Sequence, residues 1–219
     1  TSVNAEIRLD ASSSGAIPNL TMAGIHSSGS QLSILEYQGQ KVVVKGDSSL
    51  TDGASLSVRG FNGSRPPLSY IENDGIMRVD ASSAFLGALS GQGVVRVTND
   101  GNVSITSATV GETIALPSGH LNISSSSNPP PFLAAITEFG VNSSIYLADA
   151  HVLAEQNPRE VFMRSGPASG ELLIYEGSNK MVDLHISGQS NIYASSGVGN
   201  GSVLLTAYDT GHSFPIATS

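Results

Sequence analysis

Short β-forming segments, each following a turn of small residues, recur through the first part of this chain. The turn glycines are Gly53, Gly75, Gly101 and Gly119, and the steps between them are 22, 26 and 18 residues. Each glycine is followed by a run in which apolar and polar residues alternate, as in "NVSIT" at 102–106. Alternation places one face of a strand in a core and the other in water. Steps of about twenty residues are typical of the stacked coils of a solenoid.

This pattern predicts an all-β fold, a right-handed parallel β-helix (solenoid) with irregular coils and projecting loops. Glycine supplies the positive φ that a sharp turn requires, and Asn or Asp tolerates that region and can hydrogen-bond its own backbone. A β-sandwich or jelly roll is the alternative, because Asn-Gly and Asp-Gly turns also close antiparallel hairpins. The two folds differ in whether consecutive strands return in parallel, which the sequence does not reveal directly.

A Ser- and Pro-rich stretch divides the chain. The sequence "NISSSSNPPPF" spans 122–132, and its proline run cannot continue a hydrogen-bonded ladder. We therefore expect a repeat-bearing β region over 1–124, a junction over 125–132 and a C-terminal β unit over 133–219, stacked on the first. We expect ligand specificity in loops over 10–30 and 60–70.

Composition argues against several classes of function. The chain has 10 Lys and Arg against 18 Asp and Glu, a net charge of −8, which disfavours both nucleic acid and anionic lipid as partners. We expect no membrane insertion of this fragment, since no apolar run reaches the roughly 18 residues that a spanning helix needs. Only 13% of residues are charged, about half the usual share. The chain has no cysteine, so disulfides and thiolate sites are excluded.

Residues 71–124 resemble the passenger regions of bacterial autotransporter and haemagglutinin-like surface proteins. The resemblance is carried by "ENDGIMRVDASSAFLGALSGQGVVRVTNDGNVSI", in which Asn-x-Gly turns and short strands surround an "L-x-G-x-L-S-G-x-G" pattern. The C-terminal part is similar to a β unit of large secreted alphaproteobacterial proteins, through "ITEFGVNSSIYLADA", "GELLIYEG" and "VDLHISGQSNIYASSGVGNGSVLLTAYD". It departs from that pattern at "GNGSVLL", where the family usually has an Asp-Gly-x-Gly-Gly-Thr close.

The resemblance implies a secreted or cell-surface protein of bacteria that works in adhesion or biofilm formation and supplies no catalytic residues. We therefore expect an extracellular, non-catalytic adhesin-type domain. Its partners would be glycans or proteins of a cell surface or matrix, or further copies of itself.

The alternative function is a polysaccharide-acting β-helix enzyme or a carbohydrate-binding module. Such an enzyme requires acidic residues that converge with cations in a cleft. The acidic candidates are Glu36, Glu72, Asp74 and Asp80, and the cationic ones are Arg59, Arg65, Arg78 and Arg96. Scattering of these residues over unrelated faces would argue against an enzyme.

Two further groups of residues are weaker candidates for ligand binding. Tyr37, Tyr70 and Tyr175 would offer stacking surfaces to sugar rings if they were exposed, although a strand tyrosine more often packs half-buried. Asp74 and Asp100 would offer oxygen ligands to calcium if their coils were adjacent. The simpler interpretation of both Asn-Asp-Gly turns is turn geometry alone, with no cofactor. The five histidines show no paired spacing typical of a zinc site.

Overall fold

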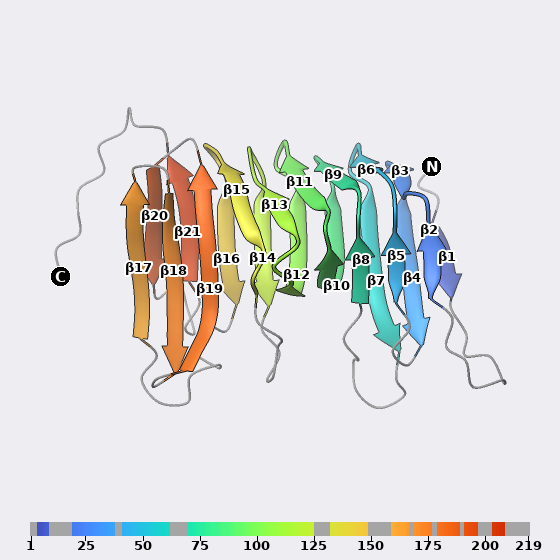
Figure 1. The fold of residues 1–219 in the computed structure, drawn as a ribbon. Coiled ribbons are helices and arrows are strands. Elements are labelled where there is room, and N and C mark those ends of the chain that lie inside the picture. Colours follow the sequence, from blue (N-terminus) through green and yellow to red (C-terminus); the bar gives the residue numbers. More distant parts are fainter. Residues whose placement is uncertain are drawn as a thin grey trace.

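The structure is a computed structural model, and it contains strands and no helix in the parts of the chain that it describes. These parts are residues 4–8, 19–37, 41–61, 70–124, 132–148, 159–166, 169–176, 179–188, 191–196 and 203–208. The strands stack along one axis into an elongated body, with β1 at one end and β17 at the other (Figure 1). Within the described residues there is no helix of the length and hydropathy needed to cross a bilayer.

Two long sheets form the main faces of this body. The first, sheet A, has the strand order β1-β4-β7-β10-β12-β14-β16-β21-β20, and the second, sheet B, the order β17-β18-β19-β15-β13-β11-β9-β6-β3. In sheet A the strands are β1 (Asn4–Arg8), β4 (Gln31–Tyr37), β7 (Ser55–Phe61), β10 (Ser83–Gly91), β12 (Asn102–Ala108), β14 (His120–Ser124), β16 (Ser144–Ala148), β20 (Asn191–Ser196) and β21 (Val203–Tyr208). In sheet B they are β3 (His26–Ser28), β6 (Ser48–Thr51), β9 (Ile76–Asp80), β11 (Val94–Thr98), β13 (Thr113–Ala115), β15 (Ala135–Phe139), β17 (Arg159–Gly166), β18 (Ser169–Glu176) and β19 (Asn179–Gly188).

A shorter third face closes the coil. It consists of β2 (Leu20–Met22), β5 (Val42–Val44), β8 (Tyr70–Asn73) and the second half of β10, all paired in parallel. The chain passes from the third face to sheet B, then to sheet A, and back to the third face. The result is a parallel β-solenoid of about five turns. The predicted solenoid is therefore confirmed, and the sandwich alternative is wrong for this part of the chain, because its strands return in parallel.

Apolar ladders explain why these residues form these strands. Burial alternates along β11, β14 and β16 as the sequence predicts. On sheet A, Val103, Leu121 and Ile145 occupy equivalent inward positions in successive coils, and all three are fully buried. Each such side chain contributes about 1.5–3 kcal/mol through burial. The same stacking continues on sheet B, so one core runs the length of the solenoid.

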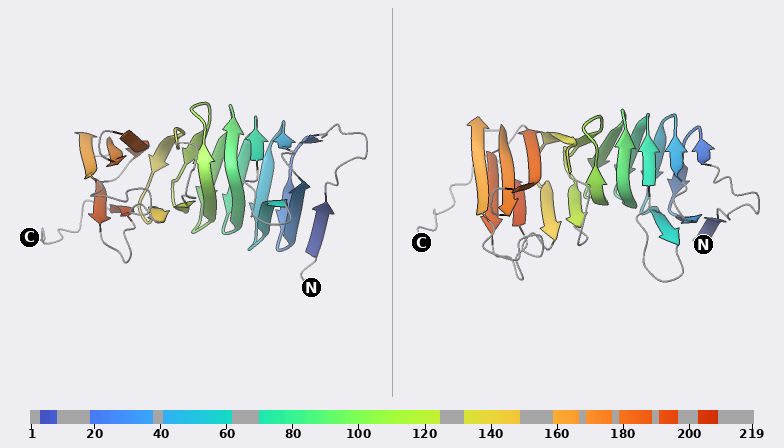
Figure 2. Two further views of the ribbon diagram at one scale, coloured as in Figure 1. Left: turned by 90° about the horizontal axis from the view of Figure 1, so that it is seen from below. Right: turned by 60° about the horizontal axis from the view of Figure 1, so that its bottom comes forward.

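The parallel stack extends past the Ser/Pro-rich stretch. Strand β15 pairs in parallel with β13, and β16 pairs in parallel with β14. The direction of pairing changes only afterwards: β17, β18 and β19 form an antiparallel meander, and β21 pairs antiparallel with both β16 and β20 (Figure 2). Strand β19 joins sheet B through a parallel pairing with β15. Residues 125–131 lie outside the described part of the chain.

Three corners connect the three faces. The first corner leads from the third face to sheet B and contains Gly24, Gly46, Gly75, Gly93 and Gly111. The second corner leads from sheet B to sheet A and contains Gly29, Gly53, Ala81, Gly101 and Gly119. The third corner leads from sheet A back to the third face. In β10 it is a bend at Gly87, which has a positive φ of 66°. Segments 38–40, 62–69 and 125–131, outside the described residues, connect the strands at this third corner in other coils.

Candidate functional site

The first Asn-Asp-Gly turn lies at the first corner and is shaped by close backbone packing. Asn73 is fully buried, and its Oδ1 accepts a hydrogen bond from Gly75 N over 3.4 Å. A Cβ on Gly75 would lie 2.3 Å from the carbonyl oxygen of Gly46 in the coil below. Because a backbone carbonyl cannot move aside without disrupting the stack, only glycine fits at this position.

The second Asn-Asp-Gly turn lies at the second corner and has a different geometry. Asn99 and Asp100 both adopt left-handed backbone conformations, with φ of 52° and 59°. The Asn99 amide donates to Asp80 Oδ1 over 2.6 Å, and Asn99 N donates to Ser118 Oγ. Both residues are exposed. Asn and Asp are among the few residues other than glycine that adopt this conformation routinely.

The two aspartates are therefore not brought together. Asp74 precedes β9 and Asp100 follows β11, and these strands pair in parallel and in register from Ile76↔Val94 to Asp80↔Thr98. The two residues lie at opposite ends of these strands, about 16 Å or more apart at roughly 3.3 Å per residue. A calcium site shared by Asp74 and Asp100 has no geometric basis. No cluster of three or more metal-ligating side chains occurs among the described residues.

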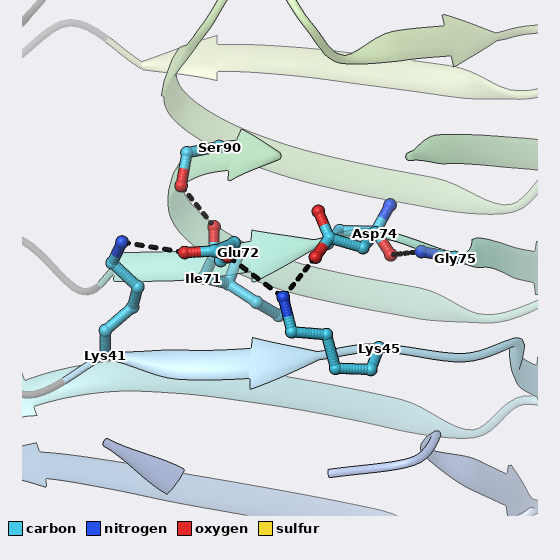
Figure 3. Close-up of polar contacts among 8 residues, drawn as sticks. Lys41, Lys45, Ile71, Glu72, Asp74, Gly75 and Ser90 are labelled. Atoms are coloured by element: carbon cyan, nitrogen blue, oxygen red, sulfur yellow. Dashed lines mark hydrogen bonds and ion pairs between the residues drawn. The ribbon is translucent and has the colours of Figure 1, made fainter. Parts of the chain in front are cut away.

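Asp74 belongs instead to a lysine–carboxylate cluster on the outside of the third face, formed by Lys41, Lys45, Glu72 and Asp74 (Figure 3). Lys41 Nζ lies 2.9 Å from Glu72 Oε2, and Lys45 Nζ lies 3.3 Å from Glu72 Oε1. Lys45 also forms an ion pair with Asp74. The lysines flank β5 and the carboxylates come from the next coil, so the cluster joins neighbouring coils.

Mutual hydrogen bonding keeps this cluster ionised. The hydrogen bond from Lys41, then that from Lys45, lowers the pKa of Glu72, and the hydrogen bond from Lys45 lowers the pKa of Asp74. The hydrogen bonds to Asp74 and then Glu72 raise the pKa of Lys45. All three shifts move titration away from neutral pH, whereas general acid–base catalysis requires a group that titrates near the working pH. The cluster therefore acts as an ionic clamp.

The remaining residues proposed for an enzyme are scattered. Asp80, the last residue of β9, accepts hydrogen bonds from Thr98 and Asn99. On the same sheet, Arg78 pairs with Asp47 and Arg96 pairs with Glu138. Arg59 lies on sheet A, where its Nε donates to Ser57. The Glu36 side chain and Arg65 fall outside the described part. Among the described side chains, the carboxylates and arginines do not converge in one place, which argues against the enzyme hypothesis.

Sequence reasoning missed a buried carboxyl group at the first corner. Glu112 is 1% exposed; its Oε2 lies 3.5 Å from the Asn73 amide nitrogen, and its Oε1 has no hydrogen-bond partner among the residues that the structure describes. Burial raises the pKa of Glu112 to about 7, against the lowering effect of hydrogen bonds from Asn73 and the Gly93 backbone. A glutamate that follows glycine in "VGETIAL" resembles any surface acid, so the sequence offers no clear signal for its burial.

The three tyrosines proposed for ligand binding lie on different faces. Tyr70 begins β8 on the third face and is 39% exposed. Tyr37 ends β4 of sheet A, and Tyr175 lies in β18 of sheet B. The side chains of Tyr37 and Tyr175 are outside the described part. The structure does not gather these three residues into one site.

The outer surface of sheet A carries a regular array that we call the polar strip. Two straight rows of outward side chains cross the strands. One row is Gln31, Ser55, Ser83, Asn102, His120 and Ser144; the other is Ser33, Ser57, Phe85, Ser104, Asn122 and Tyr146. Within the first row, His120 Nδ1 lies 2.8 Å from Ser144 Oγ, at hydrogen-bond distance. A second bond joins the rows diagonally, from the Asn122 amide to Asn102 Oδ1 over 3.0 Å.

The polar strip differs from the other faces in charge. Over these six strands the two rows contain no Asp, Glu, Lys or Arg, although the second row continues to Glu6 on β1 and Arg59 lies beside it on β7. Sheet B presents Arg78 and Arg96, and the third face presents the lysine–carboxylate cluster. The strip can exchange hydrogen bonds with a partner over several coils without the cost of desolvating an ion. No protein-family model matches this chain, and no curated protein sequence matches it significantly.

Proposed function

We propose that this chain is a non-catalytic binding domain of adhesin type, and that its polar strip is the contact surface. The observation that carries the proposal is the alignment of uncharged hydroxyl and amide side chains in straight rows over six strands of sheet A. A surface built on rigid strands holds such groups more exactly in position than loops do.

The proposal places the domain outside the cell, at a bacterial surface or matrix. It is supported by the likeness of residues 71–124 to autotransporter passenger repeats, by the absence of cysteine and by the low content of charged residues. The partners would be glycans or proteins of a cell surface or matrix, or further copies of this chain. The net charge of −8 disfavours nucleic acid as the partner.

Charge insertion tests this proposal. In Ser57→Glu and Ser104→Glu, an anion stands in the middle of the polar strip, and its desolvation should oppose any contact there. Beads coated with the purified protein are scored for attachment to bacterial cells and to extracted matrix. Attachment should fall several-fold for both variants. The matched control is Thr113→Glu, an outward position on sheet B.

The thermal unfolding midpoint of each variant shows whether the fold is retained, since all three positions face outward. Equal attachment by the strip variants, the Thr113→Glu control and the unmodified protein would contradict the proposal. Loss of attachment in the control alone would move the contact surface to sheet B.

A further inference from the structure

Phe85 is an aromatic residue at the centre of an otherwise polar surface. It lies on β10 between the inward residues Ala84 and Leu86, which are both buried, so the alternation of the strand directs Phe85 outward. The side chain is 38% exposed. Its neighbours in the row are Ser57 on β7 and Ser104 on β12, which both have short side chains.

A second aromatic residue lies on the same row. Tyr146 on β16 is separated from Phe85 by Ser104 and Asn122, one residue from each of the two intervening strands. At about 4.8 Å between neighbouring strands, three steps place the two aromatic side chains roughly 14 Å apart along the solenoid axis. The other row runs parallel to this line and presents Ser83, Asn102, His120 and Ser144 beside it.

This arrangement matches the chemistry of one class of ligand. A sugar ring has an apolar C–H face that stacks on an aromatic ring, and hydroxyl groups at its rim that exchange hydrogen bonds with Ser and Asn. An extended glycan repeats both features at regular intervals. Two aromatic platforms separated by hydroxyl and amide groups could therefore hold several consecutive sugar units of one chain.

We infer that the polar strip binds an extended neutral glycan along the solenoid axis, with Phe85 and Tyr146 as stacking platforms. This inference rests on the proposed function, because it names the ligand of the same surface. The glycan is neutral because the strip lacks the lysine and arginine side chains that recognise carboxylate or sulfate groups. Arg59 lies beside the row on β7, two residues from Ser57, and its Nε donates to Ser57 Oγ.

A protein partner fits these observations less well. Protein interfaces concentrate aromatic, Met and Arg side chains in a contiguous desolvated core. The two aromatic residues of the strip are instead separated by Ser104 and Asn122, both of which are partly exposed.

The test measures binding of the purified chain to soluble polysaccharides by affinity electrophoresis and calorimetry. The neutral probes are a mixed-linkage β-glucan, a galactomannan and a dextran, and the acidic probe is polygalacturonate. We expect binding to at least one neutral probe that does not weaken with added salt, since no ion pair is formed. Phe85→Ala should weaken it about tenfold, and Tyr146→Ala by a smaller factor. Phe85→Tyr, which keeps a ring, should retain it.

Tyr70→Ala is the matched control, since Tyr70 is exposed to a similar degree on the third face. Binding that Tyr70→Ala weakens and Phe85→Ala does not would overturn the inference. Salt-sensitive binding to polygalacturonate alone would also overturn it.

The results separate the inference from the proposed function. If no neutral probe binds, but Ser57→Glu and Ser104→Glu still abolish attachment to cells or matrix, the strip contacts a protein and only the glycan inference fails. If no neutral probe binds and the strip variants also attach as well as the unmodified protein, both the glycan inference and the proposed function fail.

Discussion

The two Asn-Asp-Gly turns have one sequence and two structural roles. At the first corner Asn73 is buried, Asp74 joins an ionic clamp, and Gly75 makes room for the backbone of the neighbouring coil. At the second corner Asn99 and Asp100 are exposed and carry the left-handed turn themselves. A shared tripeptide therefore does not imply a shared position in the coil. The first corner depends on packing and the second on backbone conformation, and this difference can be tested by mutation.

The largest expected effect is at Gly75. In Gly75→Ala the new Cβ meets the Gly46 backbone, so the two neighbouring coils must move apart at this corner. We expect a loss of more than about 3 kcal/mol in the free energy of unfolding. Gly53→Ala is the matched control: Gly53 has a φ of 76°, and within the described part of the chain no atom lies within 4 Å of the added Cβ. It should cost only about 1 kcal/mol through backbone strain. Urea denaturation measures the free energy of unfolding of both variants. Equal losses in Gly75→Ala and Gly53→Ala would contradict the difference between a packed and an open corner position.

The next largest effect concerns pH at the first corner. The pKa of Glu112 is raised to about 7 in the folded protein, against about 4.3 when unfolded, so the folded state binds the proton more tightly. The resulting stabilisation is complete below the unfolded pKa and is lost as pH rises through about 7. We therefore expect the free energy of unfolding to fall by up to about 3 kcal/mol between pH 4.5 and 8.

Glu112→Gln should remove most of this pH dependence and should stabilise the protein at pH 8, since a neutral amide replaces a buried charge. The nearby Asp74 carboxylate raises the Glu112 pKa further. Carboxylates with a lowered pKa, such as Glu72, act in the opposite direction but at lower pH: they lose their stabilisation as pH falls through that lowered pKa. If the free energy of unfolding of Glu112→Gln still fell by the full amount between pH 4.5 and 8, another titrating group would be responsible.

A smaller effect, of opposite sign at the two corners, is expected for glycine substitutions. Asp100→Gly should stabilise the protein by about 0.5–1 kcal/mol, because glycine relieves the left-handed strain at φ 59°. Asp74→Gly should destabilise it, since Asp74 has an ordinary φ and loses its bond to Lys45. Thermal unfolding of the two variants in parallel gives the sign of each change in stability. The same sign at both positions would mean that the corners are equivalent.

The smallest effect is expected for Asp74→Asn. The ion pair with Lys45 is exposed to solvent, and such pairs contribute little to stability. The unfolding midpoint should change less than in any variant above, and what change there is should disappear at high salt. A calcium-dependent property that this substitution abolished would show that the carboxylate has a role besides the clamp.

Much of the fold was predictable because alternation is a local property. Val103, Leu121 and Ile145 face inward in their strands as the pattern indicates, and the turn glycines lie at corners. The sequence did not distinguish the corners. Gly53, Gly101 and Gly119 belong to the second corner and Gly75 to the first, because both corners favour Gly, Asn and Asp for different physical reasons.

The candidate site was less predictable. The outward orientation of Phe85 has no signal in the sequence, because Ala84, Phe85 and Leu86 are three consecutive apolar residues and show no alternation. The partners of Lys41 and Lys45 lie 27 to 31 residues away along the chain. Such pairs become neighbours only through the register of the coils, which no local pattern records. The burial of Glu112 depends on the same register.

The third corner governs how such a chain can change in length. Between Gly75 and Gly111 each coil takes 18 residues, because β10 and β12 pass from sheet A directly toward the next corner. Elsewhere segments such as 62–69 and 125–131 enter at that corner while the ladders on either side keep their register. We therefore expect an insertion at this corner to leave the strand ladders intact. A foreign peptide grafted at the bend of β10, beside Gly87, would be displayed there without a shift in the strands that form the polar strip.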